Sequence, residues 1–287
     1  MTRELQNARV GRLPVLGTIL RGYGAAARLI VPCTLLAAVA SVLLVGVAYA
    51  VEALLHTTRD ARAHYTLATG LRYDGLVLLL DCLHAFAAVP LVVMVYRTII
   101  LEEALRWRSL GRLGQRELRV FALIIALDFP LLILSKVTIL TVYLGAAPFW
   151  LRQVFSAIGS PYLRLISLYA ARHLLFAILL APFFSMVFPL AAIDSPPGVL
   201  WQSIKLTRGH RTRLAMLAFF APIPIVALAY LPPLAETDNH MSIRNIILST
   251  VAHLLAFLAS AFTAAVFASA YRRISEHQHR GTLEVFD

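Results

Sequence analysis

The sequence predicts an all-α integral membrane protein that crosses the bilayer several times. Of its 287 residues, 60% are hydrophobic and only 14% are charged, and the mean hydropathy is +0.77. Soluble domains carry about 25% charged residues. Several runs also approach or exceed the roughly 20 apolar residues that a helix needs to cross the hydrocarbon core. We therefore expect a bundle of about six kinked transmembrane helices with short cytoplasmic helices at its interface.

Six apolar runs account for the expected spans. They cover residues 29–51, 76–96, 120–145, 174–193, 214–235 and 246–271. The fifth run is expected to be kinked, because it contains Pro222, Pro224, Pro232 and Pro233. The stretch 152–173 is harder to place, because a helix continuous over 161–193 would be about 50 Å long and must be broken, tilted or partly outside the bilayer. The expected organisation is a segment with a surface helix over 1–28, a six-span domain over 29–271 and a polar tail over 272–287.

The distribution of positive charge predicts the orientation. The N-terminal segment, the loops 97–119 and 194–213, and the C-terminal tail together hold 18 lysines and arginines, whereas the loops on the other side hold 7. Cytoplasmic loops carry the excess of positive charge, so both termini are expected in the cytoplasm. Arginine outnumbers lysine 24 to 2 and alanine is abundant, which is typical of a GC-rich bacterial genome. The expected location is the bacterial cytoplasmic (inner) membrane.

The segment 194–213 carries the densest helix punctuation in the chain. Asp194 or Ser195 can cap a helix, Pro196 suits its first position and Gly209 suits a left-handed stop, which predicts a helix over 196–208. Such a helix would lie on the membrane rather than cross it. The alternative is an ordinary polar loop with one helical turn. The residues expected to bind anionic lipid headgroups or an acidic protein partner are Trp201, Lys205, Arg208, Arg211 and Arg213.

The same region carries a family resemblance. The run Phe188-Pro-Leu-Ala-Ala-Ile-Asp194, followed by residues 201–210, resembles the bacterial six-span membrane domain found in some glycerophosphodiester phosphodiesterases and in stand-alone relatives. The match covers about 25 residues, and Ile204 stands where the pattern has a tryptophan. The matching residues in the second part are Ser203, Leu206, Thr207, Arg208 and Gly209. The resemblance implies the membrane domain only, because the phosphodiesterase chemistry belongs to a separate α/β barrel of about 250 residues that has no room here.

Four ionisable residues interrupt the expected spans. Asp81 and His84 stand three residues apart on the second span, and Asp128 and Lys136 lie on the third. Ionisable groups inside a bilayer are costly and suggest function by default. One interpretation is a small-solute or proton-linked transporter that uses Asp81, His84 and Lys136, with His253 as a further relay residue. The other is a structural polar cluster, with Asp81 and Lys136 paired, that fixes helix packing.

Other functional classes lack their signatures. The sequence has no His-Glu-x-x-His, Gly-x-Ser-x-Gly or P-loop motif, and Cys33 and Cys82 both lie in apolar runs. No catalytic residue, metal site or cofactor is therefore predicted, although an intramembrane enzyme built on Asp81 and His84 is an alternative. The arginines lie between apolar runs, which favours membrane lipid over nucleic acid as their partner. The function expected is a non-enzymatic module that binds lipid or a membrane protein partner.

Overall fold

The all-α prediction is confirmed by the computed structural model. It describes residues 13–55, 67–103, 114–143, 149, 153, 173–193, 198–229 and 242–283, and no strand occurs among them. The helices are α2 (Val15–Arg28), α3 (Ile30–Leu55), α5 (Leu67–Ile100), α6 (Gln115–Tyr143), the π-helix η2 (Phe176–Leu180), α9 (Ala181–Phe184), α10 (Val187–Ala192), α11 (Val199–Thr207), α12 (Arg211–Phe220), α13 (Ile223–Ala229) and α15 (Ile243–Leu283).

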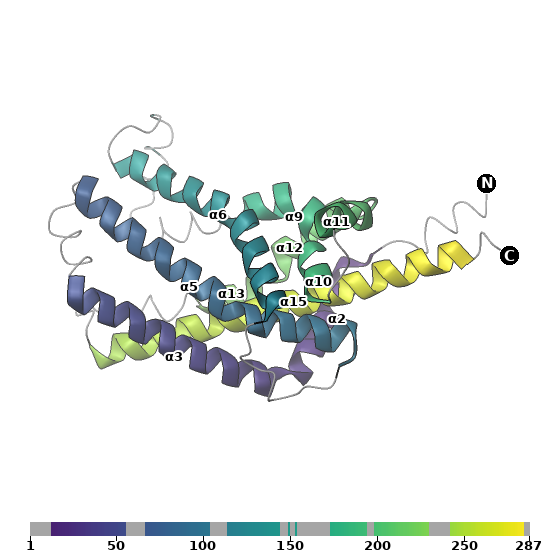
Figure 1. Ribbon diagram of the computed structural model, residues 1–287, viewed down its shortest axis with the longest axis horizontal. Coiled ribbons are helices and arrows are strands. Elements are labelled where there is room, and N and C mark those ends of the chain that lie inside the picture. The colour runs from purple at the N-terminus through teal and green to yellow at the C-terminus, as the bar shows by residue number, and fades with distance from the viewer. Residues whose placement is uncertain are drawn as a thin grey trace.

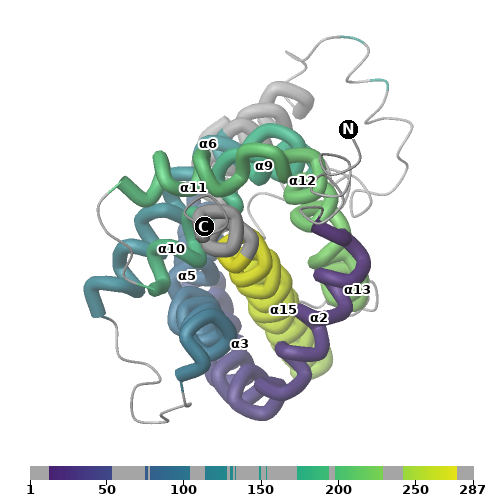
Figure 2. Tube along the Cα trace, turned by 90° about the vertical axis from the view of Figure 1, so that its right-hand side faces the viewer, coloured from purple at the N-terminus to yellow at the C-terminus, as the bar shows by residue number. Residues whose placement is uncertain are grey.

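The bundle is built around α15, which contacts α2, α3, α5 and α13 (Figures 1 and 2). Its buried face is rich in alanine, including Ala261, Ala264, Ala265 and Ala268. Small side chains allow helix backbones to approach closely, which is the usual basis of helix association in membranes. With 41 residues, α15 is about 60 Å long, twice the thickness of a hydrocarbon core. The expected span 246–271 covers only its middle, and the helix continues across the expected boundary at residue 272.

Four helices are long and apolar enough to cross a membrane. They cover Ile30–Ala53, Leu78–Ile100, Arg211–Leu228 and Ile243–Glu276. These correspond to the first, second, fifth and sixth expected spans. The third expected span falls on α6, many of whose side chains lie outside the described residues. The total of six spans therefore stays a prediction.

The fourth apolar run does not form one continuous helix. It consists of η2, α9 and α10, with a turn at Ser185 and Met186, and the apolar helix His173–Phe184 falls short of a full span. Pro182 and Pro189 lack the amide hydrogen that a continuous helix needs, which favours such breaks. Met186 is fully buried at the turn. The stretch 161–193 was expected to be broken, tilted or partly outside the bilayer, and the structure places a break at Ser185 and Met186.

The expected N-terminal surface helix is α2, and one of its faces is packed into the bundle. An added Cβ on Gly22 would lie 2.5 Å from the Cα of Val266, so the backbones of α2 and α15 are in direct contact there. The Tyr23 ring packs edge-on against Phe262 with centroids 5.0 Å apart, and its hydroxyl donates a hydrogen bond to the Ala221 carbonyl. Burial raises the pKa of Tyr23, so the phenol keeps the proton that it donates. The N-terminal helix is thus fixed to both α15 and α12.

Candidate functional site

The helix expected over 196–208 is present as α11, with slightly different ends. It starts after Gly198, whose φ of 97° lies in the left-handed region, and Arg208 follows its last residue, Thr207. The expected cap at Asp194 or Ser195 falls outside the described residues. Gly209 has a φ of 89°, which confirms it as the left-handed stop. The amide of His210 donates to the carbonyl of Thr207 over 2.9 Å, closing the corner before α12 begins.

Two apolar residues of α11 face outward, while two of its polar residues face the bundle. Its buried residues are Ser203 and Thr207, and the Ser203 hydroxyl donates to the Phe183 carbonyl over 2.8 Å. Leu200 and Trp201, in contrast, are 46% and 63% exposed. A helix in water buries its apolar stripe. The outward face of α11 therefore suits surroundings that are less polar than water.

Three of the predicted cations lie at the corner between α11 and α12. The ammonium of Lys205 is 5.8 Å from the centre of the Trp201 ring, and the guanidinium of Arg211 is 4.4 Å from the centre of the Phe183 ring. Arg208 is exposed between them in the sequence. Cation–π contacts of this kind contribute about 0.5–1 kcal/mol at exposed sites. They hold two of the charges close to the apolar residues of the same surface.

Arg213, the fourth predicted cation, has a different position. It is half-buried, and its guanidinium donates to the carbonyl of Leu13 over 3.1 Å. This bond joins the start of α12 to Leu13, two residues before α2 begins. Arg213 therefore fastens two segments 200 residues apart in the chain. We define the interfacial surface as Leu200, Trp201, Lys205, Arg208 and Arg211, without Arg213.

The orientation of α11 fits an interfacial helix. Figure 1 shows α11 nearly end-on, while Figure 2, turned by 90°, shows it lengthwise across the end of the bundle. In the second view α15 runs toward the viewer, so the two helices cross steeply. An interfacial helix, as expected for this segment, would cross the transmembrane direction in this way.

Arg97, near the C-terminal end of α5, makes contacts that were not predicted from the sequence. Its guanidinium forms a two-pronged ion pair with Glu103, with Nε 2.8 Å from Oε2. It also donates to the carbonyl of Ala192, the last residue of α10, over 3.3 Å. A cation at a helix C-terminus is favoured by the helix dipole. The sequence signal that could have indicated these contacts is the position of Arg97 in the last turn of a span, shortly before Glu102 and Glu103.

Arg272 of α15 binds the same end of α5. It donates to the carbonyl of Ile99 over 3.1 Å and pairs with Glu102 at 2.9 Å. Glu102 has a φ of 55°, which an L-residue adopts at a cost. Together Arg97 and Arg272 tie α5 to α10 and α15. Nothing in the local sequence around residue 272 points to a partner 173 residues away.

The four intramembrane ionisable residues are only partly described. The ring of His84 stacks on Phe257 of α15, with centroids 4.1 Å apart and planes 9° apart, and lies 5.7 Å from the ring of His253. Asp81 is half-buried one turn earlier on α5. The side chains of Asp128 and Lys136 lie outside the described residues. The pairing of Asp81 with Lys136 therefore stays a prediction, while His84 is placed beside His253.

Among the described residues, no three histidine, cysteine, aspartate or glutamate side chains come together as a metal site would require. Cys33 is buried and Cys82 half-buried, and neither is in a disulfide. No protein family matches the chain, and neither a curated protein nor a solved structure shows significant similarity to it. The functional argument consequently rests on the geometry of the chain itself.

Proposed function

We propose that this is a non-enzymatic protein of the bacterial inner membrane whose interfacial surface binds anionic lipid headgroups. The observation that carries the proposal is the outward face of α11, on which Leu200 and Trp201 are exposed beside Lys205, while Ser203 and Thr207 face the bundle. An exposed tryptophan beside an exposed leucine is unfavourable in water. At a membrane interface both side chains reach apolar surroundings while the indole N–H stays near the headgroups.

Charge supports lipid as the ligand. The cations lie close to the exposed apolar residues. Lys205 is one helical turn after Trp201, and Arg208 and Arg211 are at the corner that follows α11. With Trp201 at the interface, all three lie at headgroup height. Each cation near an anionic membrane surface contributes about 1 kcal/mol of attraction. An acidic membrane protein partner would use the same charges. Lipid is favoured because the outward apolar face is continuous with the cations.

The resemblance to the phosphodiesterase-associated membrane domains agrees with this proposal. Three residues that carry it have structural roles in α11: Ser203 and Thr207 face the bundle, and Gly209 provides the corner. In this chain the pattern therefore corresponds to a helix followed by a sharp turn. We propose that the relation concerns this helix and not a catalytic activity.

Transport is the alternative, and the packing of His84 bears on it. A proton path through Asp81, His84 and Lys136 needs these side chains to face water. The His84 ring instead stacks face to face on the Phe257 ring, and Phe257 is fully buried. This contact favours a structural role for His84.

The first prediction concerns the three cations of the interfacial surface. A variant with Lys205, Arg208 and Arg211 all changed to Gln should retain less phosphatidylglycerol or cardiolipin than the wild type. The expected loss of attraction is about 3 kcal/mol in total, or roughly a hundredfold in affinity. Native mass spectrometry of gently extracted protein measures the retained lipid.

Arg213→Gln is the matched control, because Arg213 binds the Leu13 carbonyl instead of facing outward. It should lower thermal stability while leaving the retained lipid nearly unchanged. Equal lipid content in the triple variant and the wild type would contradict the lipid site and would mean that the cations serve only to orient the protein in the membrane. Retention of an acidic polypeptide in place of lipid would favour the protein partner.

The second prediction concerns orientation. Both termini and the interfacial surface are proposed to be cytoplasmic, as the 18-to-7 charge asymmetry indicates. Ser203 is unsuitable as a labelling site because it is fully buried, whereas Arg208 is exposed. In a background without Cys33 and Cys82, Arg208→Cys should react with an impermeant maleimide only in inverted vesicles. Reaction in intact cells would contradict the proposed orientation.

A further inference from the structure

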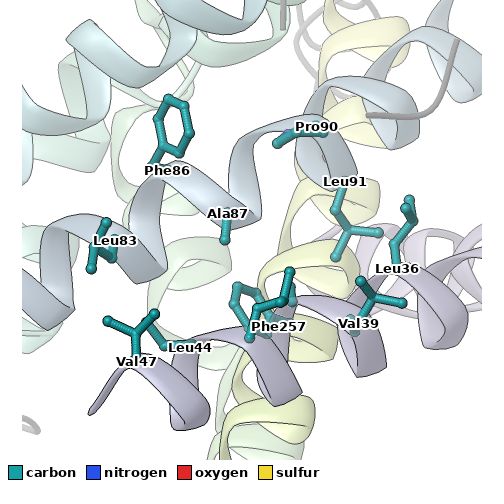
Figure 3. A pocket seen from close by; sticks show the side chains of 13 residues that line it. Leu36, Val39, Leu44, Val47, Leu83, Phe86, Ala87, Pro90, Leu91 and Phe257 are labelled. Atoms are coloured by element: carbon teal, nitrogen blue, oxygen red, sulfur yellow. The ribbon is translucent and has the colours of Figure 1, made fainter. Parts of the chain in front are cut away.

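A narrow apolar groove runs between α3 and α5 (Figure 3). Its volume is about 290 Å³, and every side chain that lines it is apolar. The walls include Leu36, Ala40 and Val47 of α3 and Leu83 and Ala87 of α5, and Phe257 of α15 lies between them. The groove is far from the interfacial surface, since α3 and α11 lie on different sides of the bundle in both views (Figures 1 and 2).

The sequence explains why this space is left open. Ala37, Ala40 and Ala87 place only methyl groups on walls that elsewhere carry leucine and phenylalanine. Pro90 lies inside α5, where its ring removes a backbone hydrogen bond and bends a helix. Where the backbones of α3 and α5 are not in direct contact, these short side chains leave the space between the two helices unfilled.

The surroundings of the groove indicate what fills it. Both walls belong to helices long and apolar enough to span the membrane, so lipid hydrocarbon is the medium around them. An empty gap forfeits the dispersion contacts of its lining, and a hydrocarbon chain restores them. Lipid chains are as apolar as leucine, so shape rather than hydrophobicity selects the occupant.

The dimensions favour a single chain over a helix. From Leu36 to Val47 the wall of α3 rises about 16 Å at 1.5 Å per residue. The groove volume of 290 Å³ over that length corresponds to a cross-section on the order of 20 Å². A helix 10–12 Å across has a cross-section of roughly 80–110 Å². A transmembrane helix of a partner protein could only lie across the mouth of the groove, whereas a single acyl chain fits inside it.

The position of the groove along α3 indicates where a headgroup would lie. Leu36 and Val47 are about equally far from the two ends of the apolar span Ile30–Ala53, so the groove lies at the middle depth of the span. Beyond Leu36 the chain of α3 leads back to Arg28, the last residue of α2, which is exposed. A phospholipid whose chain enters from this end would place its phosphate near this cation.

We propose that the groove between α3 and α5 is a lipid site that holds one acyl chain of a membrane phospholipid, with its headgroup toward the end of α3 that leads to Arg28. The bound lipid replaces protein side chains in the contact between the two helices. It exchanges more slowly than lipid on the outer surface of the bundle, because it is contacted by three helices. The site does not depend on the interfacial surface of α11.

The test replaces a small residue in the groove wall with a large one, so that the new side chain occupies the groove. Ala40→Trp places an indole in the groove, whereas Val42→Trp places the same side chain on the outer face of α3, where Val42 is 60% exposed and absent from the groove wall. Each protein is reconstituted in vesicles of phosphatidylethanolamine and phosphatidylglycerol, re-extracted, washed with detergent and examined by native mass spectrometry. The wild type and Val42→Trp should keep one tightly held phospholipid, and Ala40→Trp should lose it.

Ala87→Leu narrows the groove from the opposite wall with a side chain smaller than tryptophan. It tests the same expectation if Ala40→Trp does not fold. Retention of the phospholipid by a folded groove-filling variant would overturn the proposal, as would a washed wild type that holds only detergent or a polypeptide. The triple Gln variant of the interfacial surface should still keep this lipid. Its loss from that variant alone would assign the lipid to α11 and overturn the groove site.

Discussion

Replacing Gly22 with alanine is expected to separate α2 from α15 and to lower the melting temperature of the purified protein. The added methyl group would lie 2.5 Å from the Cα and 2.7 Å from the backbone nitrogen of Val266, and no side-chain rotation can relieve a contact with backbone. Overpacking of this kind costs about 1–3 kcal/mol. The backbone shift should also weaken the hydrogen bond from Tyr23 to the Ala221 carbonyl.

Gly24→Ala on the same helix is the matched control. A Cβ on Gly24 would meet nothing within 4 Å, and alanine is about 1 kcal/mol more favourable than glycine in a helix interior. The two changes should therefore shift the thermal unfolding midpoint in opposite directions. If Gly22→Ala stabilises the protein as Gly24→Ala does, the close contact between α2 and α15 is not present in the membrane protein.

The helical fold could be predicted from the sequence because long, continuous apolar runs indicate membrane-spanning helices. The first span was expected over 29–51 and α3 covers Ile30–Leu55, while the second was expected to end at residue 96 and α5 ends at Ile100. The prediction ended the second span before Arg97 because a charged residue was taken to mark its end, and the helix has one further turn. The guanidinium of Arg97 instead binds Glu103 and the Ala192 carbonyl, so the helix continues past the charge.

The break in the fourth apolar run was not located by the sequence, for a different reason. Hydropathy measures how apolar a run is and carries no information on its direction. The turn at Ser185 and Met186 lies inside a run without charges, and Met186 is as buried as any residue of the core. The prolines at 182 and 189 permit a break but do not show where the chain turns.

The candidate site was predicted in part. The helix α11, its glycine stop and three outward cations follow from local pattern, because caps, turns and helical spacing are local properties. The assignment of Arg213 to the outward set could not be corrected locally, since its partner Leu13 is 200 residues away. The groove between α3 and α5 depends on which alanines face each other across two helices, and no single run of sequence contains that information.

The second large effect is expected for Phe257→Ala on α15. Phe257 is fully buried, stacks on His84 and forms part of the groove between α3 and α5. Removing a buried phenylalanine costs about 3–5 kcal/mol in soluble cores. In a bilayer the transfer term is smaller because lipid is also apolar, so the loss should lie near the lower end, about 3 kcal/mol. Thermal unfolding in detergent measures it.

Ile247→Ala is the control on the same helix, since Ile247 is 57% exposed and its truncation should change stability by less than about 0.5 kcal/mol. The truncation at Phe257 also widens the groove, which links it to lipid. Added phospholipid should raise the unfolding midpoint of Phe257→Ala more than that of Ile247→Ala, because a chain in the enlarged groove restores lost contacts. Equal midpoints for the two variants without lipid would mean that Phe257 does not hold α3, α5 and α15 together.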